Sequence, residues 1–405
     1  MSTYLNISDK IGLQSTPNPS LLNLYGGAAA AYSLRQLDYN YTDAAVNVRR
    51  DSDQSTKDIG FVNGELDTAT LESFTNETVV LFDEDFTTDP GWTLQPSANI
   101  SNGKLNFTNS TGSTQAFEGY GAVRYTKVRV TYTITDYTSG AISFINLGGG
   151  GAGTQRNAVG TYVEEFTLQN GNANWGFWTV SSFTGSVDNY KVEVIQCNAF
   201  VTTWYDQSGN ANNATQATAS SQPKIVTAGS TILENGKAAV EFNGTSDNMA
   251  TSSNFIANTD LSLFLLRKFN STALKPQDII SQGATTNSEG FKYGISGGGQ
   301  EQLAIYYSSI YVPTDGTTTT NQELHSLITT SSATTLNINA TSQTLSTSSG
   351  SQIGNNNDPL TIGQRDSGGG LFNGNIQELV IYTADKSTDE GGIETNINSH
   401  YNIYP

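Results

Sequence analysis

Short runs of apolar residues, either continuous or alternating with polar residues, recur along the chain and are separated by glycine, asparagine or aspartate. Clear examples, rich in β-branched or aromatic residues, are residues 45–50, 128–134, 187–194, 261–266 and 376–382. Such runs are typical of β-strands joined by tight turns. The pattern therefore predicts an all-β protein.

Three segments depart from the strand pattern. Residues 26–37 are rich in alanine, leucine, arginine and glutamine, which favour helices, so a short helix lying against a sheet is predicted there. Residues 393–401 have the apolar spacing of a short terminal helix. Residues 1–23 contain two prolines and no periodicity, which predicts an extended N-terminal arm.

The composition and charge of the chain limit which classes of binding partner are expected. The formal net charge of −18 repels phosphate backbones, which excludes nucleic acid and anionic membranes as favoured partners. The N-terminus has no signal-peptide pattern, and no apolar run reaches the ~18 residues of a membrane span, so neither is expected. Cys197 is the only cysteine, so no intrachain disulfide can form, which favours folding in a cytoplasm.

Three segments resemble the early part of the α-L-arabinofuranosidase B catalytic domain. They are residues 27–35, 48–61 and 200–210, and the last contains the sequence Trp-Tyr-Asp-Gln-Ser-Gly-Asn at 204–210. In that family the first two segments run almost directly into the third. The resemblance therefore implies that residues 77–195 are inserted into one parent domain made of residues 24–76 and 196–405.

The two parts resemble different carbohydrate-related folds. Residues 77–195, whose strands span the usual length of one β-sandwich, resemble carbohydrate-binding-module jelly rolls through residues 82–94, 100–105 and 183–189. The C-terminal part resembles laminin-G-like, concanavalin-type sandwiches through residues 240–247 and 361–382. Together they imply a concanavalin-like β-sandwich (jelly roll) interrupted by a second, inserted β-sandwich.

This combination without a signal peptide resembles bacteriophage virion proteins. It implies a capsid decoration, tail fibre or tail-associated adhesin that folds in the host cytoplasm and is displayed on the virion surface. The partners implied are cell-surface or environmental polysaccharide and other virion proteins. A homo-oligomer stays open, because the chain has no heptad segment that would set its number.

Catalytic residues do not stand out. A retaining glycosidase needs two carboxyls ~5 Å apart, and spacing singles out none of the acids in motif-like settings, which are Glu65, Asp67, Asp206, Glu241, Asp247 and Glu378. The arabinofuranosidase family builds its sugar pocket with adjacent cysteines, which this chain lacks. The sequence thus favours a binding protein over an enzyme, with no catalytic residue assigned.

Four groups of residues are candidates for binding or structural roles. Trp175 and Trp178 are candidates for stacking on sugars, but residues three apart in a strand face opposite sides, so one belongs to the core. Asp83 and Asp85, in an acidic cluster, and Asp247 are candidate calcium ligands, with a solvated edge as the alternative. Asp206 and Gly209 are predicted to form a structural Asx-turn.

Three hypotheses of function remain. The first is a virion surface protein that binds glycans without cleaving them. The second is a glycan depolymerase or arabinofuranosidase-like hydrolase, which a close carboxyl pair in a sugar-sized cleft would support. The third is a purely structural virion protein whose lectin-like folds serve only as interaction modules.

Overall fold

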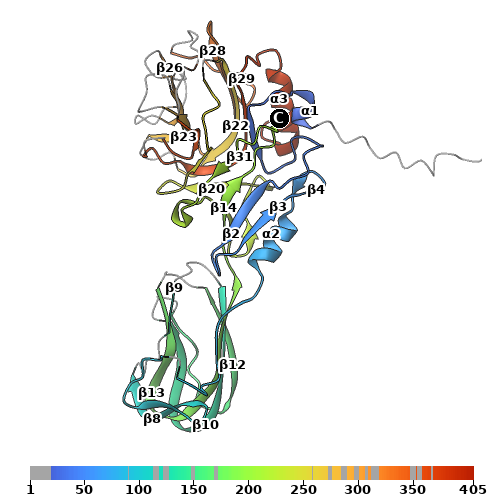
Figure 1. The fold of residues 1–405 in the computed structure, drawn as a ribbon. Helices are drawn as coiled ribbons and strands as arrows, with labels where there is room; N and C mark the ends of the chain where they lie inside the picture. The colour runs from blue at the N-terminus through green and yellow to red at the C-terminus, as the bar shows by residue number, and fades with distance from the viewer. Residues whose placement is uncertain are drawn as a thin grey trace, which may run out of the picture.

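The fold is a computed structural model, and it confirms the all-β prediction. The residues that the structure describes are 20–89, 91–112, 118–121, 127–146, 151–167, 172–257, 259–271, 276–283, 290–295, 301–305, 309–311, 319–346, 353, 358–365 and 368–405. Figure 1 shows two β-structures one above the other, joined by a narrow waist beside α2 (Thr68–Thr75). We call the upper one the larger sandwich and the lower one the smaller sandwich.

The larger sandwich has two layers. One contains β1 (Ala30–Ser33), β22 (Leu261–Phe269), β27 (Gln322–Thr329), β28 (Thr334–Ile338), β29 (Thr341–Ser342) and β31 (Asn373–Tyr382). The other contains β2 (Val46–Arg50), β3 (Thr56–Ile59), β14 (Ala199–Trp204), β15 (Ala214–Thr215), β21 (Met249–Ala250), β23 (Gln277–Gln282), β24 (Phe291–Ile295), β25 (Glu301–Ile305), β26 (Ser309–Tyr311) and β30 (Thr361–Ile362).

Shorter elements join and flank these layers. The strands β16 (Lys224–Thr227) and β20 (Val240–Asn243) link β14 to β31, and β17 (Ser230–Thr231) pairs with β16. Two hairpins lie outside the layers: β4 (Phe61–Val62) with β5 (Glu65–Leu66), and β18 (Leu233–Glu234) with β19 (Lys237–Ala238). The remaining helices are α1 (Leu21–Leu24), α3 (Glu390–Tyr401) and a short 3-10 helix at Ala219–Ser221.

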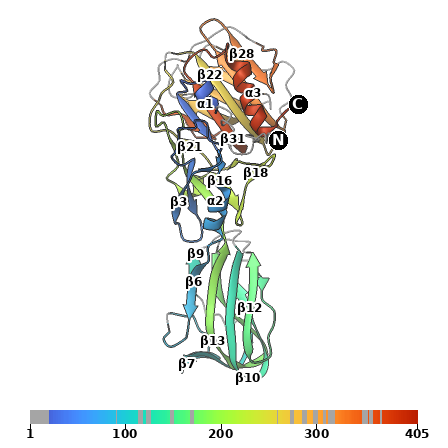
Figure 2. The same cartoon turned by 90° about the vertical axis from the view of Figure 1, so that its right-hand side faces the viewer.

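Both faces of β22 are buried. Leu263 and Leu265 point into the core between the layers, whereas Phe264 and Leu266 belong to a second cluster with Ile393 of α3. Figure 2 shows α3 lying across β22 and β31. A strand buried on both faces reads as a continuous apolar run, which explains the sequence of residues 261–266. The terminal helix predicted at 393–401 is confirmed as part of α3.

The helix predicted at residues 26–37 is wrong. Ala30–Ser33 instead form β1, which pairs antiparallel with β31, for example Ala30 with Ile381. Helix propensity is a weak preference, and pairing with a buried strand overrides it here. Of the predicted extended arm, residues 1–19 lie outside the described residues, and Leu21–Leu24 form a helical turn with Leu21 buried.

The smaller sandwich has its own core. Its strands are β6 (Val79–Glu84), β7 (Ala98–Ser101), β8 (Lys104–Gly112), β9 (Glu118–Gly121), β10 (Lys127–Asn146), β11 (Gly151–Ala152), β12 (Gly160–Thr167) and β13 (Asn172–Gln196). The long strands β10 and β13 pair antiparallel with each other along most of their length. The register between them shifts several times, including near Gly140 and Gly185, where a Cβ would collide with Phe183 and with the Asp136 carbonyl.

The chain enters and leaves the smaller sandwich at neighbouring points. The Cys197 amide donates to the Thr75 carbonyl at 3.0 Å, and the buried Cys197 thiol lies 3.3 Å from the same oxygen. Burial raises the pKa of this thiol to about 11, so it stays protonated at neutral pH. None of the helices that the structure describes is long and apolar enough to cross a membrane.

Candidate glycan-binding site

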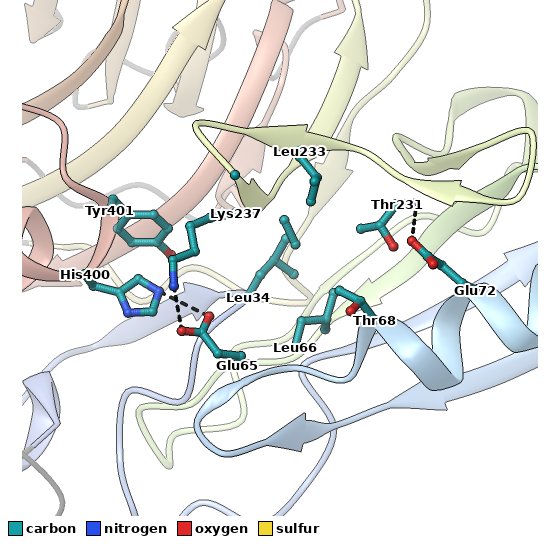
Figure 3. Close-up of a pocket in the computed structure, with 12 residues that line it drawn as sticks. Leu34, Glu65, Leu66, Thr68, Glu72, Thr231, Leu233, Lys237, His400 and Tyr401 are labelled. Carbon is teal, nitrogen blue, oxygen red and sulfur yellow. Dashed lines mark hydrogen bonds and ion pairs between the residues drawn. The ribbon is translucent and has the colours of Figure 1, made fainter.

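A cavity of about 340 Å³ lies in the larger sandwich, beside the waist, between the two outer hairpins, α2 and the C-terminal end of α3. Its lining divides into three parts, as Figure 3 shows. One end is polar and contains Glu65, Lys237, His400 and Tyr401, and the middle is apolar and contains Leu34, Leu66 and Leu233. The opposite end is polar again and contains Thr68, Glu72 and Thr231.

The first polar end is organised by Glu65, which β5 presents. Lys237 Nζ lies 2.7 Å from Glu65 Oε1, and His400 Nε2 lies 3.4 Å from Glu65 Oε2. Burial, together with the charge of Arg35, lowers the pKa of His400 to about 4. The imidazole is therefore neutral at pH 7, and its contact with Glu65 is not an ion pair there. Among the described residues, Lys237 is the cation that forms an ion pair with Glu65 at neutral pH.

The opposite end has polar groups with spare hydrogen-bonding capacity. The Thr231 amide donates to Glu72 Oε1 at 3.0 Å, which joins β17 to α2. The Thr231 hydroxyl is buried, and within the described part of the chain it has no hydrogen-bond partner. An unsatisfied buried hydroxyl costs free energy unless something binds it. This end of the cavity thus combines a carboxylate with a neighbouring hydroxyl that has no partner within the described part of the chain and whose oxygen is covered by the protein.

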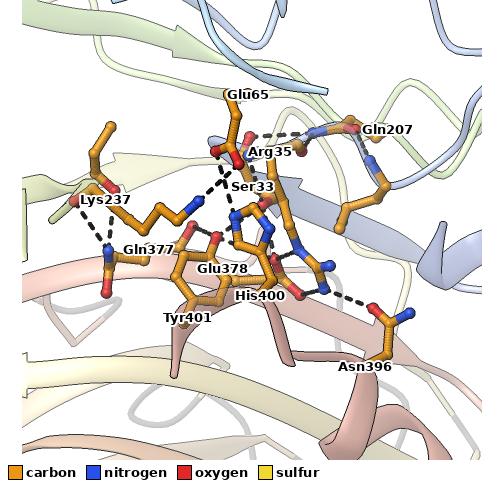
Figure 4. Close-up of polar contacts among 12 residues, drawn as sticks. Ser33, Arg35, Glu65, Gln207, Lys237, Gln377, Glu378, Asn396, His400 and Tyr401 are labelled. Atoms are coloured by element: carbon orange, nitrogen blue, oxygen red, sulfur yellow. Dashed lines mark hydrogen bonds and ion pairs between the residues drawn. The ribbon is translucent and has the colours of Figure 1, made fainter. Parts of the chain in front are cut away.

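A buried ion pair supports the first polar end from below (Figure 4). Arg35 Nε and Nη2 donate to the two oxygens of Glu378 at 2.7 and 2.9 Å, and the Glu378 side chain has no exposed surface. The Ser33 and Tyr401 hydroxyls lie 2.9 and 3.2 Å from Glu378 Oε2. This network fixes the end of α3, and with it the position of His400.

The acids of this region serve as hydrogen-bond acceptors and ion-pair partners. Burial raises the pKa of Glu378, but the charge and hydrogen bonds of Arg35 outweigh burial, so the net pKa lies below its usual value. Asp67 caps α2 by accepting the Thr70 amide at 3.0 Å. A general acid of a glycosidase needs a raised pKa. Glu378 is held in the opposite, ionised state.

The two candidate tryptophans lie on opposite faces of β13. Trp175 is completely buried and packs on Phe144 with ring centroids 5.5 Å apart, so the structure leaves no face of it for a sugar. Trp178 is 36% exposed and lies opposite Ser143 of β10. Of this pair, only Trp178 has the exposure that stacking on a sugar requires.

The candidate calcium ligands do not meet. Asp83 and Asp85 lie at the end of β6 in the smaller sandwich, and Asp247 lies in the larger one. Asp85 Oδ1 accepts the Thr87 amide and hydroxyl in a turn. Asp247 is buried, which raises its pKa to about 6, and it accepts the Asn243 amide at 3.0 Å. Among the described residues no three acids, histidines or cysteines are grouped to hold a metal ion.

Asp206 and Gly209 lie in a loop that is hydrogen-bonded to β1. Asp206 Oδ1 accepts the Ala31 and Ser208 amides, both at 2.8 Å, and Oδ2 accepts the Asn212 amide at 3.0 Å. Gly209 has a φ of 87°, in the left-handed region that glycine adopts without strain. All the described acceptor contacts of Asp206 are used inside the protein, which is the geometry of a structural turn.

Sequence reasoning missed most of the cavity. Glu65 was one of six candidate acids and His400 one of two histidines, but Lys237, Thr231 and Glu72 carry no local signal. Polar residues on hairpins and at helix surfaces are common, and only the tertiary fold brings these together.

Comparison with known proteins adds information on the fold. The family model described as "Concanavalin A-like lectin/glucanases superfamily" matches residues 243–390. No curated protein sequence matches this chain.

Several solved structures are similar at low identity. An arabinofuranosidase complexed with arabinofuranosyl-alpha-1,2-xylobiose is 13% identical with a TM-score of 0.46, and the match covers 91% of this chain and 62% of that one. The binding domain of Paraclostridial Mosquitocidal Protein 1 is 15% identical with a TM-score of 0.36, covering 49% and 50%. A Trypanosoma rangeli sialidase is 11% identical with a TM-score of 0.34, covering 49% and 31%.

At such TM-scores these structures carry no argument about the cavity. The chain also spans only 62% of the length of the arabinofuranosidase that it matches. The family match and the two-layer β-architecture agree with each other, and they establish that the chain has a concanavalin-like β-sandwich fold.

Proposed function

We propose that this protein binds glycans without cleaving them and that the cavity beside α3 is its sugar site. The observation that carries the proposal is the lining of the cavity, which has hydrogen-bonding groups at both ends and leucines between them. A sugar ring has the matching pattern, because hydroxyls surround it while its C–H face is apolar. The volume of about 340 Å³ falls at the lower end of the usual range for small-molecule sites, roughly 300–1,000 Å³.

The contacts of the acids favour binding over hydrolysis. Hydrolysis of a glycosidic bond needs one carboxyl that gives up a proton and a second that attacks or activates water. Glu65 is paired with Lys237, and Glu72 accepts the Thr231 amide. Both carboxyls thus already have a partner inside the protein.

We further propose that the protein is displayed on the surface of a bacteriophage particle, as a capsid decoration, fibre or tail-associated adhesin. Support comes from the sequence resemblance and from an architecture that needs no disulfide. A host or environmental polysaccharide is then the ligand. Electron microscopy of particles labelled with an antibody to this chain tests the location, and labelling of no virion structure would contradict it.

A glycan array with the purified chain tests the binding function, with release of reducing sugar followed in parallel. We expect binding without release, and weaker binding of the bound glycan by Thr231→Val, which removes only the buried hydroxyl. Thr227→Val, an exposed position in the same β16–β17 hairpin, is the matched control and should bind normally.

Other outcomes assign the function elsewhere. Loss of binding in Trp178→Ala but not in Thr231→Val would move the sugar site to the smaller sandwich. Release of sugar would show that the protein is a hydrolase, and an array without any bound glycan would favour a purely structural role.

A further inference from the structure

The two polar ends of the cavity differ in charge. At one end the carboxylate of Glu65 is compensated by Lys237 at 2.7 Å. At the other end Glu72 has no cation within ion-pair distance among the described residues, and its described contact is the Thr231 amide. The Glu72 end therefore presents an uncompensated negative charge to whatever enters.

We propose that the cavity accepts uncharged sugars and excludes acidic ones such as uronates, and that Glu72 is the residue that makes this distinction. The inference rests on the proposed function, since it defines the ligand class of the same site. It combines three features of the Glu72 end, taken over the described residues: a carboxylate without a paired cation, a buried hydroxyl without a hydrogen-bond partner, and the hydrogen bond from the Thr231 amide that joins them.

A neutral sugar satisfies this end of the cavity. A sugar hydroxyl both donates and accepts, so one hydroxyl can donate to Glu72. A neighbouring one can pair with the Thr231 hydroxyl after the threonine side chain changes rotamer and turns its covered oxygen toward the cavity. A hydrogen bond to a charged acceptor is stronger than one between neutral groups. Binding then also removes the penalty of the unpartnered Thr231 hydroxyl, which the free protein carries.

An acidic sugar finds no compensating charge. A ligand carboxylate at this end would meet Glu72, and placing like charges side by side in an interface is strongly unfavourable. At the other end Lys237 is already paired with Glu65, and His400 is neutral at pH 7 because its pKa is about 4. The net charge of −18 adds repulsion over a longer range.

The test uses matched pairs of oligosaccharides that differ only in a CH₂OH or a carboxylate at C6. The pairs are glucose with glucuronate, galactose with galacturonate, and mannose with mannuronate, and affinities are measured for the pair whose neutral member binds. We expect the wild type to prefer the neutral sugar by about tenfold or more. Glu72→Gln keeps an acceptor for the Thr231 amide but removes the charge, so the preference should fall to about threefold or less.

A control variant separates the local effect from the total charge. Asp83→Asn removes one exposed charge from the smaller sandwich and should leave the preference unchanged. A wild type that binds both members of a pair equally, or a Glu72→Gln variant that keeps the full preference, would overturn the inference while the glycan-binding function stands. Failure of every neutral and acidic sugar to bind would overturn the proposed function itself.

Discussion

Replacing Arg35 with methionine leaves the carboxylate of Glu378 without its cation inside the larger sandwich. Glu378 has no exposed surface, and its remaining described donors are the hydroxyls of Ser33 and Tyr401. Removing one partner of a buried ion pair costs about 3–5 kcal/mol, because the other charge stays buried without compensation. We expect Arg35→Met to lower the free energy of unfolding of the larger sandwich by about this amount at pH 7.

The loss depends on pH. The folded-state pKa of Glu378 lies below its usual value, so its contribution to stability is complete above the unfolded pKa of about 4.3 and is lost as pH falls through the lower folded value. In Arg35→Met the cation is gone and burial, the largest influence on Glu378, should place the folded pKa above the unfolded one. As the Glu378 carboxyl becomes protonated, the variant no longer carries the cost of an uncompensated buried charge. The difference between variant and wild type should narrow on acidification towards about pH 4.

Native-state hydrogen exchange of peptides from β1 and β31 measures this free energy in the larger sandwich by itself. The exposed pair Arg129 and Glu165, 3.0 Å apart in the smaller sandwich, provides a matched control. Arg129→Met should cost about 1 kcal/mol or less, because exposed ion pairs contribute little.

A double variant tests whether the two charges are coupled. Replacing both Arg35 and Glu378 with methionine removes both charges and should recover most of the loss. The reasoning is refuted if Arg35→Met costs less than about 1 kcal/mol, or if the double variant is as unstable as the sum of the two single variants.

Other parts of the molecule give three further expectations. Gly185→Ala should destabilise the smaller sandwich by roughly 1–3 kcal/mol in urea, because its Cβ would collide with the Asp136 carbonyl; wild-type unfolding would contradict this. Trp175→Ala should lower the free energy of unfolding by about 3–5 kcal/mol, and Trp178→Ala by about 1 kcal/mol or less, because only Trp175 is fully buried. Equal losses of stability in the two variants would contradict this difference in burial. The pKa of His400 is about 4 in the folded protein and about 6.5 in the unfolded chain, so the folded protein binds fewer protons between these values. The free energy of unfolding should therefore fall by about 2 kcal/mol as the pH is lowered from about 6.5 to 4. The same dependence of unfolding free energy on pH in His400→Gln would refute this.

Strands could be predicted from the sequence because the pattern of apolar residues in each strand follows from which of its two faces are buried. Residues 128–134 and 187–194 were predicted as strands and lie in β10 and β13. The alternation rule also required one of Trp175 and Trp178 to be core. The segment at 26–37 could not be predicted in this way, because its alanines owe their strand conformation to pairing with β31.

The cavity could not be predicted, because its parts come from separate elements. Glu72 lies on α2, Thr231 on β17 and Lys237 on an outer hairpin, and none of them belongs to a recognisable motif. Their significance depends on distances and on a missing hydrogen-bond partner at Thr231, which only the fold reveals. The resemblance of residues 200–210 pointed instead to a loop whose contacts are structural.

Because the chain enters and leaves the smaller sandwich at adjacent points, Thr75 and Cys197, we expect that sandwich to be exchangeable as a unit, which we call the cassette. A short connection from one point to the other closes a small loop, and closing a small loop costs little conformational entropy. The larger sandwich can therefore keep its core while the cassette is removed, replaced or duplicated. The proposed sugar site lies in the larger sandwich, so exchanging the cassette should leave that site unchanged.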